Sequence, residues 1–288
     1  MDGAGLPTAT AQVAAREPGA PLARLLRAAT PVATVVHREA KIGDSLCTLP
    51  ALLALAGLLG REVAVRGAFC PAVAPLLRHL PLRFEPAPAG NPLLEFRLDI
   101  QRVYQDANQA DEHMAAGFCR HLGLPLPALP EALPLAAEDI GLPAGIVLSP
   151  FSGSANGWYK VWPTDRWLAL ADRLARCHPD LPLYVIGGAD DDMSPYAAAG
   201  PMPLPGLALP EVLGLLRAAA AVISIDNGIS HLAHFGAVAR HVLLYPALLA
   251  PALVANPRAR ILRAAPEAIG VDQVWRETDA LLSPALAG

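Results

Sequence analysis

From Pro31 onward, short runs of β-branched and aliphatic residues alternate with longer segments rich in leucine and alanine. The short runs predict strands, because buried parallel strands are continuously apolar, and the longer segments predict the helices that connect them. We predict strands at 32–36, 62–66, 146–149, 183–186, 221–225 and 241–245. We predict helices at 48–60, 72–79, 101–122, 163–177, 210–219 and from about 229. This alternation is typical of α/β proteins with parallel sheets.

A proline-rich segment separates two series of alternating elements. Between 124 and 143 the chain contains five prolines and little periodicity, which favours an interdomain linker at 124–143. We therefore divide the chain into a flexible tail at 1–20, an N-terminal α/β domain at 21–123, this linker, and a C-terminal α/β domain at 144–288. Two such domains in succession place a ligand site at the carboxyl ends of the strands, in a cleft between the domains.

The composition raises the question of membrane insertion. Hydrophobic residues make up 53% and charged residues 17% of the 288 positions, and the mean hydropathy is +0.37. The most apolar uncharged stretches, 45–60 and 242–257, are 16 residues long and contain proline, whereas a transmembrane helix needs about 18–20 residues. We therefore expect no transmembrane segment.

Charge and cysteine usage narrow the range of partners. The formal net charge of −4 gives no long-range attraction to phosphate backbones, so we expect no nucleic-acid partner. The N-terminal residues lack the pattern of a secretory signal, and the expected location is the cytoplasm. Cys47, Cys70, Cys119 and Cys177 form no C-x-x-C pair, so we expect neither zinc sites nor disulfides.

Three loops that follow predicted strands contain polar residues suited to chemistry. In the first, Gly43 permits a close approach of the backbone and Asp44 lies at or just before the start of a helix. The helix dipole favours an ionised carboxylate there, which could accept a proton as a general base. Lys41 would help to keep Asp44 ionised. The alternative is that Asp44 only caps the helix.

The second loop, residues 149–163, combines small hydroxyl-bearing residues with one lysine. Ser152, Gly153 and Ser154 offer hydroxyl and backbone N–H groups, and Lys160 offers a positive charge between aromatic residues. Together these groups could hold a diphosphate. The alternative is an ordinary strand-to-helix loop with a solvated lysine.

The third loop connects a strand to a short helix. Asp226 follows the strand, Asn227 and Gly228 form the turn, and His231 lies in the first helical turn. Free backbone N–H groups at this helix start predict an anion site. A metal site built from Asp226, His231 and His234 would lack an established ligand pattern, so we expect no metal, and we expect His234 to pack against the sheet.

The three loops, in this order, resemble motifs of the family 9 glycosyltransferases, the ADP-heptose:lipopolysaccharide heptosyltransferase group. The similar motifs are G-D-x-x-x-T-x-P at Gly43, Asp44, Thr48 and Pro50, K-x-W-P at Lys160, Trp162 and Pro163, and D-[ST]-G-x-x-H at Asp226, Gly228 and His231. The likeness extends from about Pro31 to Tyr245.

The resemblance implies a GT-B fold, in which two Rossmann-like domains with parallel sheets face a central cleft. It also implies that the N-terminal domain holds the acceptor and the C-terminal domain holds the nucleotide-sugar, without a cofactor or a metal. The residues it implicates are Asp44 as the base; Ser152, Gly153, Ser154, Lys160, Asn227, Gly228 and His231 at the donor diphosphate; Asp191 at the ribose; and Lys41, Gly43 and Asp226 in support.

Three features depart from the family pattern. Asn227 stands where the family usually has serine or threonine, so a hydroxyl for the phosphate is lost. Asp191 follows the G-G turn where glutamate is usual, which shortens the reach of its carboxylate to the ribose. The N-terminal half is also compact, with few residues between the strand at Leu82 and the helix at Gln101.

The expected activity is metal-independent transfer of a sugar, with inversion, from a nucleotide diphosphate donor to a glycan or glycolipid acceptor. ADP-heptose is the candidate donor, and a lipopolysaccharide or other surface-glycan precursor is the candidate acceptor. Peripheral contact with the inner membrane stays open. Two alternatives remain: a nucleotide-sugar epimerase or hydrolase of the same fold, and a non-catalytic protein that binds nucleotide-sugars or acts in assembly.

Overall fold

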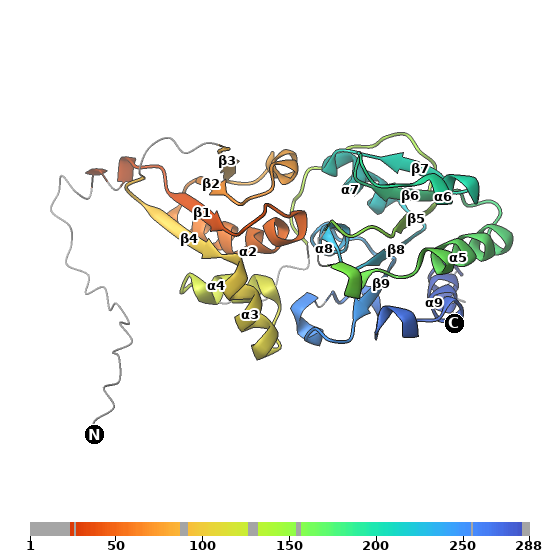
Figure 1. Cartoon of the computed structure of the whole chain (residues 1–288). Helices are drawn as coiled ribbons and strands as arrows, with labels where there is room; N and C mark the ends of the chain where they lie inside the picture. Colours follow the sequence, from red (N-terminus) through yellow and green to blue (C-terminus); the bar gives the residue numbers. More distant parts are fainter. Residues whose placement is uncertain are drawn as a thin grey trace, which may run out of the picture.

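The computed structural model describes residues 24–25, 27–86, 92–125, 132–153, 157–254 and 256–283. Its strands form two separate parallel sheets, each flanked by helices (Figure 1). The tail predicted at 1–20 lies outside the described residues.

The N-terminal sheet has the strand order β3-β2-β1-β4. Its strands are β1 (Val32–Val36), β2 (Val63–Gly67), β3 (Leu82–Phe84) and β4 (Glu95–Asp99). Its helices are α2 (Ile42–Leu59), the 3-10 helix η1 (Pro71–Leu77), α3 (Ile100–Ala110) and α4 (Met114–His121). The strand order reverses between β1 and β4, so α2 and α3 leave neighbouring strands in different directions. A crevice opens at such a switch point.

The C-terminal sheet has the order β10-β9-β8-β5-β6-β7. Its strands are β5 (Ile146–Ser149), β6 (Leu183–Gly187), β7 (Met202–Pro205), β8 (Ala221–Ile225), β9 (His241–Pro246) and β10 (Ala259–Ala264). Its helices are η2 (Gly157–Lys160), α5 (Thr164–Cys177), α6 (Ser194–Ala198), α7 (Leu209–Ala218), α8 (Gly228–Phe235), η3 (Pro251–Val254), η4 (Pro266–Ala268) and α9 (Val271–Leu282). Here the switch point lies between β5 and β8, the two strands that precede the second and third candidate loops.

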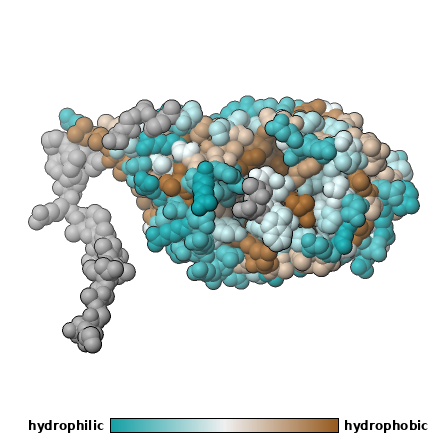
Figure 2. Space-filling model, in the orientation of Figure 1, coloured by the Kyte–Doolittle hydropathy of each residue, from teal (hydrophilic) through white to brown (hydrophobic). Residues whose placement is uncertain are grey.

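The residues predicted to link the domains run between them as an extended segment. Residues 132–143 contain no helix or strand. The Leu133 N–H donates to the Phe235 carbonyl of α8 (2.8 Å), and the Ala136 N–H donates to the Leu76 carbonyl of η1 (3.0 Å). The segment is therefore hydrogen-bonded to both domains, and Figure 2 shows the two domains in contact.

Side chains near the C-terminal end of α3 form a second connection between the domains. The Asn108 side chain accepts a hydrogen bond from the Ala250 N–H (2.8 Å). The Asp111 carboxylate accepts one from the Ala252 N–H (2.9 Å). Because Ala250 and Ala252 lie at η3, these contacts hold the C-terminal domain against α3.

Several predicted boundaries differ from the structure for local reasons. The helix predicted at 48–60 begins at Ile42, and Pro50 lies inside it. The helix predicted at 101–122 is two helices, because Asp111 has a left-handed conformation (φ 47°) that ends α3. The helix predicted at 72–79 is the 3-10 helix η1, which contains two prolines.

One helix of the described residues, α2, is long and apolar enough to cross a membrane by length and composition. Of this segment, 56% is buried inside the protein. Its buried residues pack against the N-terminal sheet, α4 and α8. We therefore assign α2 to the core of the fold.

Three buried histidines are His113 and His234, which meet at the domain boundary, and His241 within the C-terminal sheet. The ring of His113, at the start of α4, lies 5.3 Å from the ring of His234. The His113 Nδ1 accepts the N–H of Ala115 (3.0 Å) and so caps α4. His241 on β9 pairs with the Ser224 hydroxyl (2.8 Å). Burial lowers the pKa of His113 and of His241 to about 3, so both side chains are neutral at physiological pH.

Candidate active site

The two switch points meet where the N-terminus of α2 contacts the N-terminus of α8. A Cβ atom added at Gly43 would lie 2.7 Å from Cδ2 of His231. One added at Gly228 would lie 2.8 Å from Cβ of Ile42. Both distances are shorter than carbon–carbon van der Waals contact, so this approach requires glycine at both positions. The first and third candidate loops are thus brought together across the domain boundary.

Lys160 and Asp226 form a buried ion pair beside this contact. Their Nζ and Oδ2 atoms are 2.6 Å apart, and the Asp226 side chain is 3% exposed. Burial alone would lower the pKa of Lys160, but Asp226 outweighs it and the net pKa is raised. The lysine is therefore a fixed cation, unlike the solvated lysine of the alternative interpretation.

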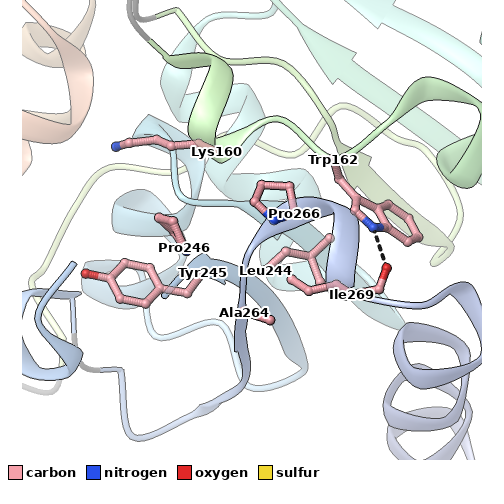
Figure 3. Close-up of a pocket in the computed structure, with 8 residues that line it drawn as sticks. All are labelled: Lys160, Trp162, Leu244, Tyr245, Pro246, Ala264, Pro266 and Ile269. Atoms are coloured by element: carbon pink, nitrogen blue, oxygen red, sulfur yellow. Dashed lines mark hydrogen bonds between the residues drawn. The ribbon is translucent and has the colours of Figure 1, made fainter. Parts of the chain in front are cut away.

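The segment that carries Lys160 is anchored by Trp162. Figure 3 shows Lys160 extending from η2 in a pocket that is lined in part by Tyr245 and Pro246 of β9. The Trp162 indole N–H donates to the Ile269 carbonyl (2.9 Å), and its ring packs edge-on against Trp167, with ring centroids 5.0 Å apart. These contacts fix the backbone just after Lys160.

Asp44 lies in the first turn of α2 and does not cap it. Lys41 occupies the N-cap position, and none of the hydrogen bonds among the described residues is a side-chain cap at this end. Burial raises the pKa of Asp44, and the charges of His231, His37, Lys160 and Lys41 oppose this effect in decreasing order. The result is a carboxylate with increased basicity beside cationic groups. Lys41 itself is paired with Glu39 (3.0 Å).

The start of α8 corrects the expectation of several free N–H groups. The Asn227 Oδ1 accepts the N–H groups of Ile229 (3.0 Å) and Ser230 (3.1 Å). Its amide Nδ2 donates to the Ser149 hydroxyl (3.0 Å) and the Phe151 carbonyl (2.9 Å). Asn227 therefore caps the helix and ties it to the end of β5, because its amide has both an acceptor and a donor.

His231 is held between the two domains. Its Nδ1 lies 3.4 Å from the Cys47 Sγ of α2, and its Nε2 lies 3.9 Å from Asp226 Oδ1. Burial lowers the pKa of His231, although the Asp226 charge acts in the opposite direction. His234, one turn later, faces His113 rather than this site. Among the described residues, no group of three or more His, Cys, Asp or Glu side chains could hold a metal ion.

A hollow of about 300 Å³ lies next to the ends of β5 and β6. Its lining includes Ser152, Asp191 and the aromatic rings of Phe151 and Tyr196, which meet edge-on with centroids 5.7 Å apart. The Asp191 carboxylate accepts the Gly188 N–H (2.7 Å), which fixes it at the rim. Aromatic walls beside two carboxylates, Asp191 and Asp192, suit a nucleoside.

The second loop is described only in part. A Cβ atom at Gly153 would meet no heavy atom of the described residues within 4 Å, so the backbone there is open. Ser154 lies outside the described residues.

Two residues of the N-terminal domain that face the site were not singled out from the sequence. Cys47 occupies an unspecified position of the first motif. Tyr104 of α3 lies near Tyr159 of η2, and its pKa is raised by burial first and then by the neighbouring Tyr159, Asp226 and Asp44. No motif marks either residue, because each reaches the site only through domain contact.

Residues 136–245 match the model of glycosyltransferase family 9 (heptosyltransferase). The match covers 110 of the 288 residues, most of them in the C-terminal domain. The match includes the second and third candidate loops, and the predicted resemblance to the family is confirmed. A search of curated protein sequences finds no match.

Solved structures of glycosyltransferases share the fold. ADP-heptose LPS heptosyltransferase II of E. coli aligns with a TM-score of 0.59 and 16% identity over 88% of this chain and 98% of that one. A family 9 glycosyltransferase of Veillonella parvula aligns with a TM-score of 0.65 and 15% identity, over 88% and 97%. The iron-containing dodecameric glycosyltransferase TibC of enterotoxigenic E. coli aligns with a TM-score of 0.60 and 18% identity, over 81% and 62%. This chain thus spans less than two thirds of the length of TibC. The shared architecture of these structures confirms the predicted GT-B fold.

Proposed function

We propose that this protein is a glycosyltransferase that moves a sugar, with inversion and without a metal, from a nucleotide diphosphate donor to a hydroxyl of a glycan or glycolipid. The observation that carries the proposal is the contact between Gly43, the residue before Asp44, and the His231 ring across the domain boundary, with Asp226 lying close to both His231 and Lys160. A basic carboxylate on one domain, with a cation and an imidazole on the other, is suited to an in-line displacement in which the carboxylate serves the acceptor and the cation serves the leaving group.

The donor is assigned to the C-terminal domain. Its nucleoside fits the hollow beside Asp191, and its diphosphate extends toward Lys160, His231 and the start of α8. Because Asn227 occupies the N–H groups of Ile229 and Ser230, the phosphates depend mainly on the Lys160 charge. Asp226 holds that lysine in place and limits its motion.

Asp44 acts as the general base. Its carboxylate takes the proton of the acceptor hydroxyl while the hydroxyl oxygen forms a bond to the anomeric carbon. The bond from that carbon to the diphosphate oxygen breaks on the opposite face, so the anomeric configuration inverts. Lys160 stabilises the negative charge that develops on the departing nucleotide diphosphate.

ADP-heptose is the first donor to test. The structure of TibC was solved in complex with ADP-D-beta-D-heptose, and that of E. coli WaaC with ADP-2-deoxy-2-fluoro heptose. We extend this donor class to the present chain as a proposal, with a lipopolysaccharide or other surface-glycan precursor as acceptor.

The test begins with the melting temperature of the purified protein in a panel of ADP-, UDP- and GDP-sugars. A donor at about 100 times its dissociation constant adds about 2.7 kcal/mol to the free energy of unfolding. The donor that stabilises most is then incubated with truncated lipopolysaccharide, and the glycosylated product is identified by mass spectrometry. Donor cleavage without an acceptor would indicate a hydrolase, and a flat response to every donor would overturn the proposal.

A further inference from the structure

The contact between Cys47 and His231 joins two domains through groups 184 positions apart in the sequence. Cys47 lies one helical turn after Asp44 on α2, and its side chain is fully buried. Its sulfur lies 3.4 Å from the imidazole Nδ1, within hydrogen-bonding distance for sulfur. The thiol is thus partnered with a residue that we assign to the donor diphosphate.

Contacts on three sides restrict the His231 ring. Cys47 faces Nδ1, Asp226 lies on the Nε2 side at 3.9 Å, and the Cα of Gly43 leaves just enough room for Cδ2. Gly43 and Cys47 both come from α2. When the domains are closed, the N-terminal domain therefore sets the position of an imidazole that belongs to the C-terminal domain.

The distribution of protons around the ring follows from its surroundings. Burial raises the pKa of Cys47 well above that of an ordinary thiol, and the negative charges of Asp44 and Asp226 raise it further, so the sulfur carries its proton. Burial lowers the pKa of His231 and favours a neutral ring with one N–H. The other ionisable groups that act on this ring are Lys160 of η2 and His113 at the start of α4. A thiol that donates to Nδ1 leaves the ring proton on Nε2.

We propose that Cys47 is a positioning residue whose thiol holds His231 as the Nε2–H tautomer while the two domains are closed. This inference rests on the proposed function for the role of His231 at the diphosphate. In that tautomer the imidazole presents a donor, and not a lone pair, on the side of Asp226 and the phosphate site. When the cleft opens, the Cys47 thiol moves away from His231 and no longer fixes its tautomer. The donor-binding geometry is therefore complete only in the closed protein.

The direct test is ¹⁵N NMR of the full chain labelled at histidine, with His231→Asn used to assign the His231 signals. We expect the wild-type protein to show a protonated Nε2 and an unprotonated Nδ1. Cys47→Ser keeps a donor and should retain this pattern, whereas Cys47→Ala should give a mixture of tautomers. A proton on Nδ1 in the wild type, or an unchanged pattern in Cys47→Ala, would overturn the proposal. The NMR result does not require sugar transfer, so its failure is distinguishable from failure of the proposed function.

Kinetics supply the second arm, with Cys119→Ala as the matched control. Cys119 is also a buried cysteine of the N-terminal domain, located in α4. Cys47→Ala should lower kcat about two- to tenfold, the size of one lost hydrogen bond, with the acceptor KM unchanged and with rescue by Cys47→Ser. Equal losses in Cys47→Ala and Cys119→Ala, without rescue by serine, would show that Cys47 only fills space.

Discussion

The two helices that meet at the candidate active site begin in opposite ways. At the start of α8, the Asn227 side chain caps two N–H groups and also binds the end of β5. The start of α2 lacks a side-chain cap among the described hydrogen bonds and carries Asp44 in its first turn. In the proposed mechanism, α8 therefore contributes mainly a rigid frame, whereas α2 contributes the general base.

The largest effect on turnover should come from a substitution of Asp44, at the start of α2. Asp44→Asn keeps the shape of the side chain but removes its basicity. We expect turnover to fall by about 10²–10⁴, while donor affinity stays within a few-fold of wild type. Single-turnover transfer and donor titration separate the two quantities. Retention of most of the transfer rate would rule out Asp44 as the base.

The same variant has an expected signature in stability. The pKa of Asp44 is raised in the folded state, so folding favours the protonated form, and stability is lost as pH rises from the ordinary carboxyl pKa through the raised one. At pH 7 the wild-type protein has lost this stability because Asp44 is ionised, whereas Asp44→Asn has no carboxylate and does not lose it. We therefore expect the melting temperature of Asp44→Asn to exceed that of the wild type at pH 7, with the difference shrinking as the pH falls through the raised pKa of Asp44.

Gly43→Ala tests the close approach of the two helix starts. The added methyl group would meet the clamped ring of His231 at 2.7 Å, so the domains or the ring must shift. We expect kcat/KM to fall by about 10²-fold, the cost of a displacement near 1 Å. Gly57→Ala in the same helix is the control, because its Cβ meets no described atom within 4 Å and should stabilise the protein by about 0.5–1 kcal/mol.

Lys160→Ala removes the cation beside α8. We expect the affinity for nucleotide diphosphates to fall about ten- to a hundredfold, because a charge-assisted hydrogen bond is lost. Binding of the free nucleoside should be unaffected. The variant should also be less stable, since Asp226 is left buried without its partner. Equal losses for nucleotide and nucleoside in calorimetric titrations would place Lys160 away from the phosphates.

The smallest effect should come from Asn227, which we assign to the frame. Asn227→Ser keeps an oxygen for the cap but loses the amide that binds Ser149 and Phe151. We expect a loss of about 1 kcal/mol in the free energy of unfolding and donor affinity within a few-fold of wild type. Urea denaturation and donor titration measure the two effects. A large loss of affinity with unchanged stability would contradict this assignment.

The central strands were predictable because their signal is local. The segments 146–149 and 221–225 are apolar runs between turn residues, and both coincide with β5 and β8. In contrast, β4 carries charged residues on an edge strand of the N-terminal sheet and shows no apolar run. The start of α2 was placed too late, because Pro50 resembles a first-turn proline but lies inside the helix.

The candidate site also has a part that local sequence patterns predict and a part that they do not. Asp44, Lys160 and His231 follow strand ends within recognisable motifs, so their residue types and spacing indicate a phosphate and proton-transfer site. The bridge from Asn227 to Ser149 and the contact between Cys47 and His231 depend on side chains 78 and 184 positions apart. Such contacts are set by how the strands and domains pack, which no local pattern encodes.

The buried neutral histidines His113 and His241 limit how far the pH can be lowered before the protein unfolds. His113 and His241 take up protons near pH 6.5 once unfolded but resist protonation to about pH 3 when folded. Below pH 6.5, each therefore shifts the equilibrium toward the unfolded chain by about 1.4 kcal/mol per pH unit. Together the two histidines lower the free energy of unfolding by about 5 kcal/mol at pH 4.5. This loss is comparable to the whole free energy of unfolding of many domains. Acid elution or storage near pH 4.5 should therefore unfold the protein. Refolding at neutral pH then requires both histidines to lose their protons.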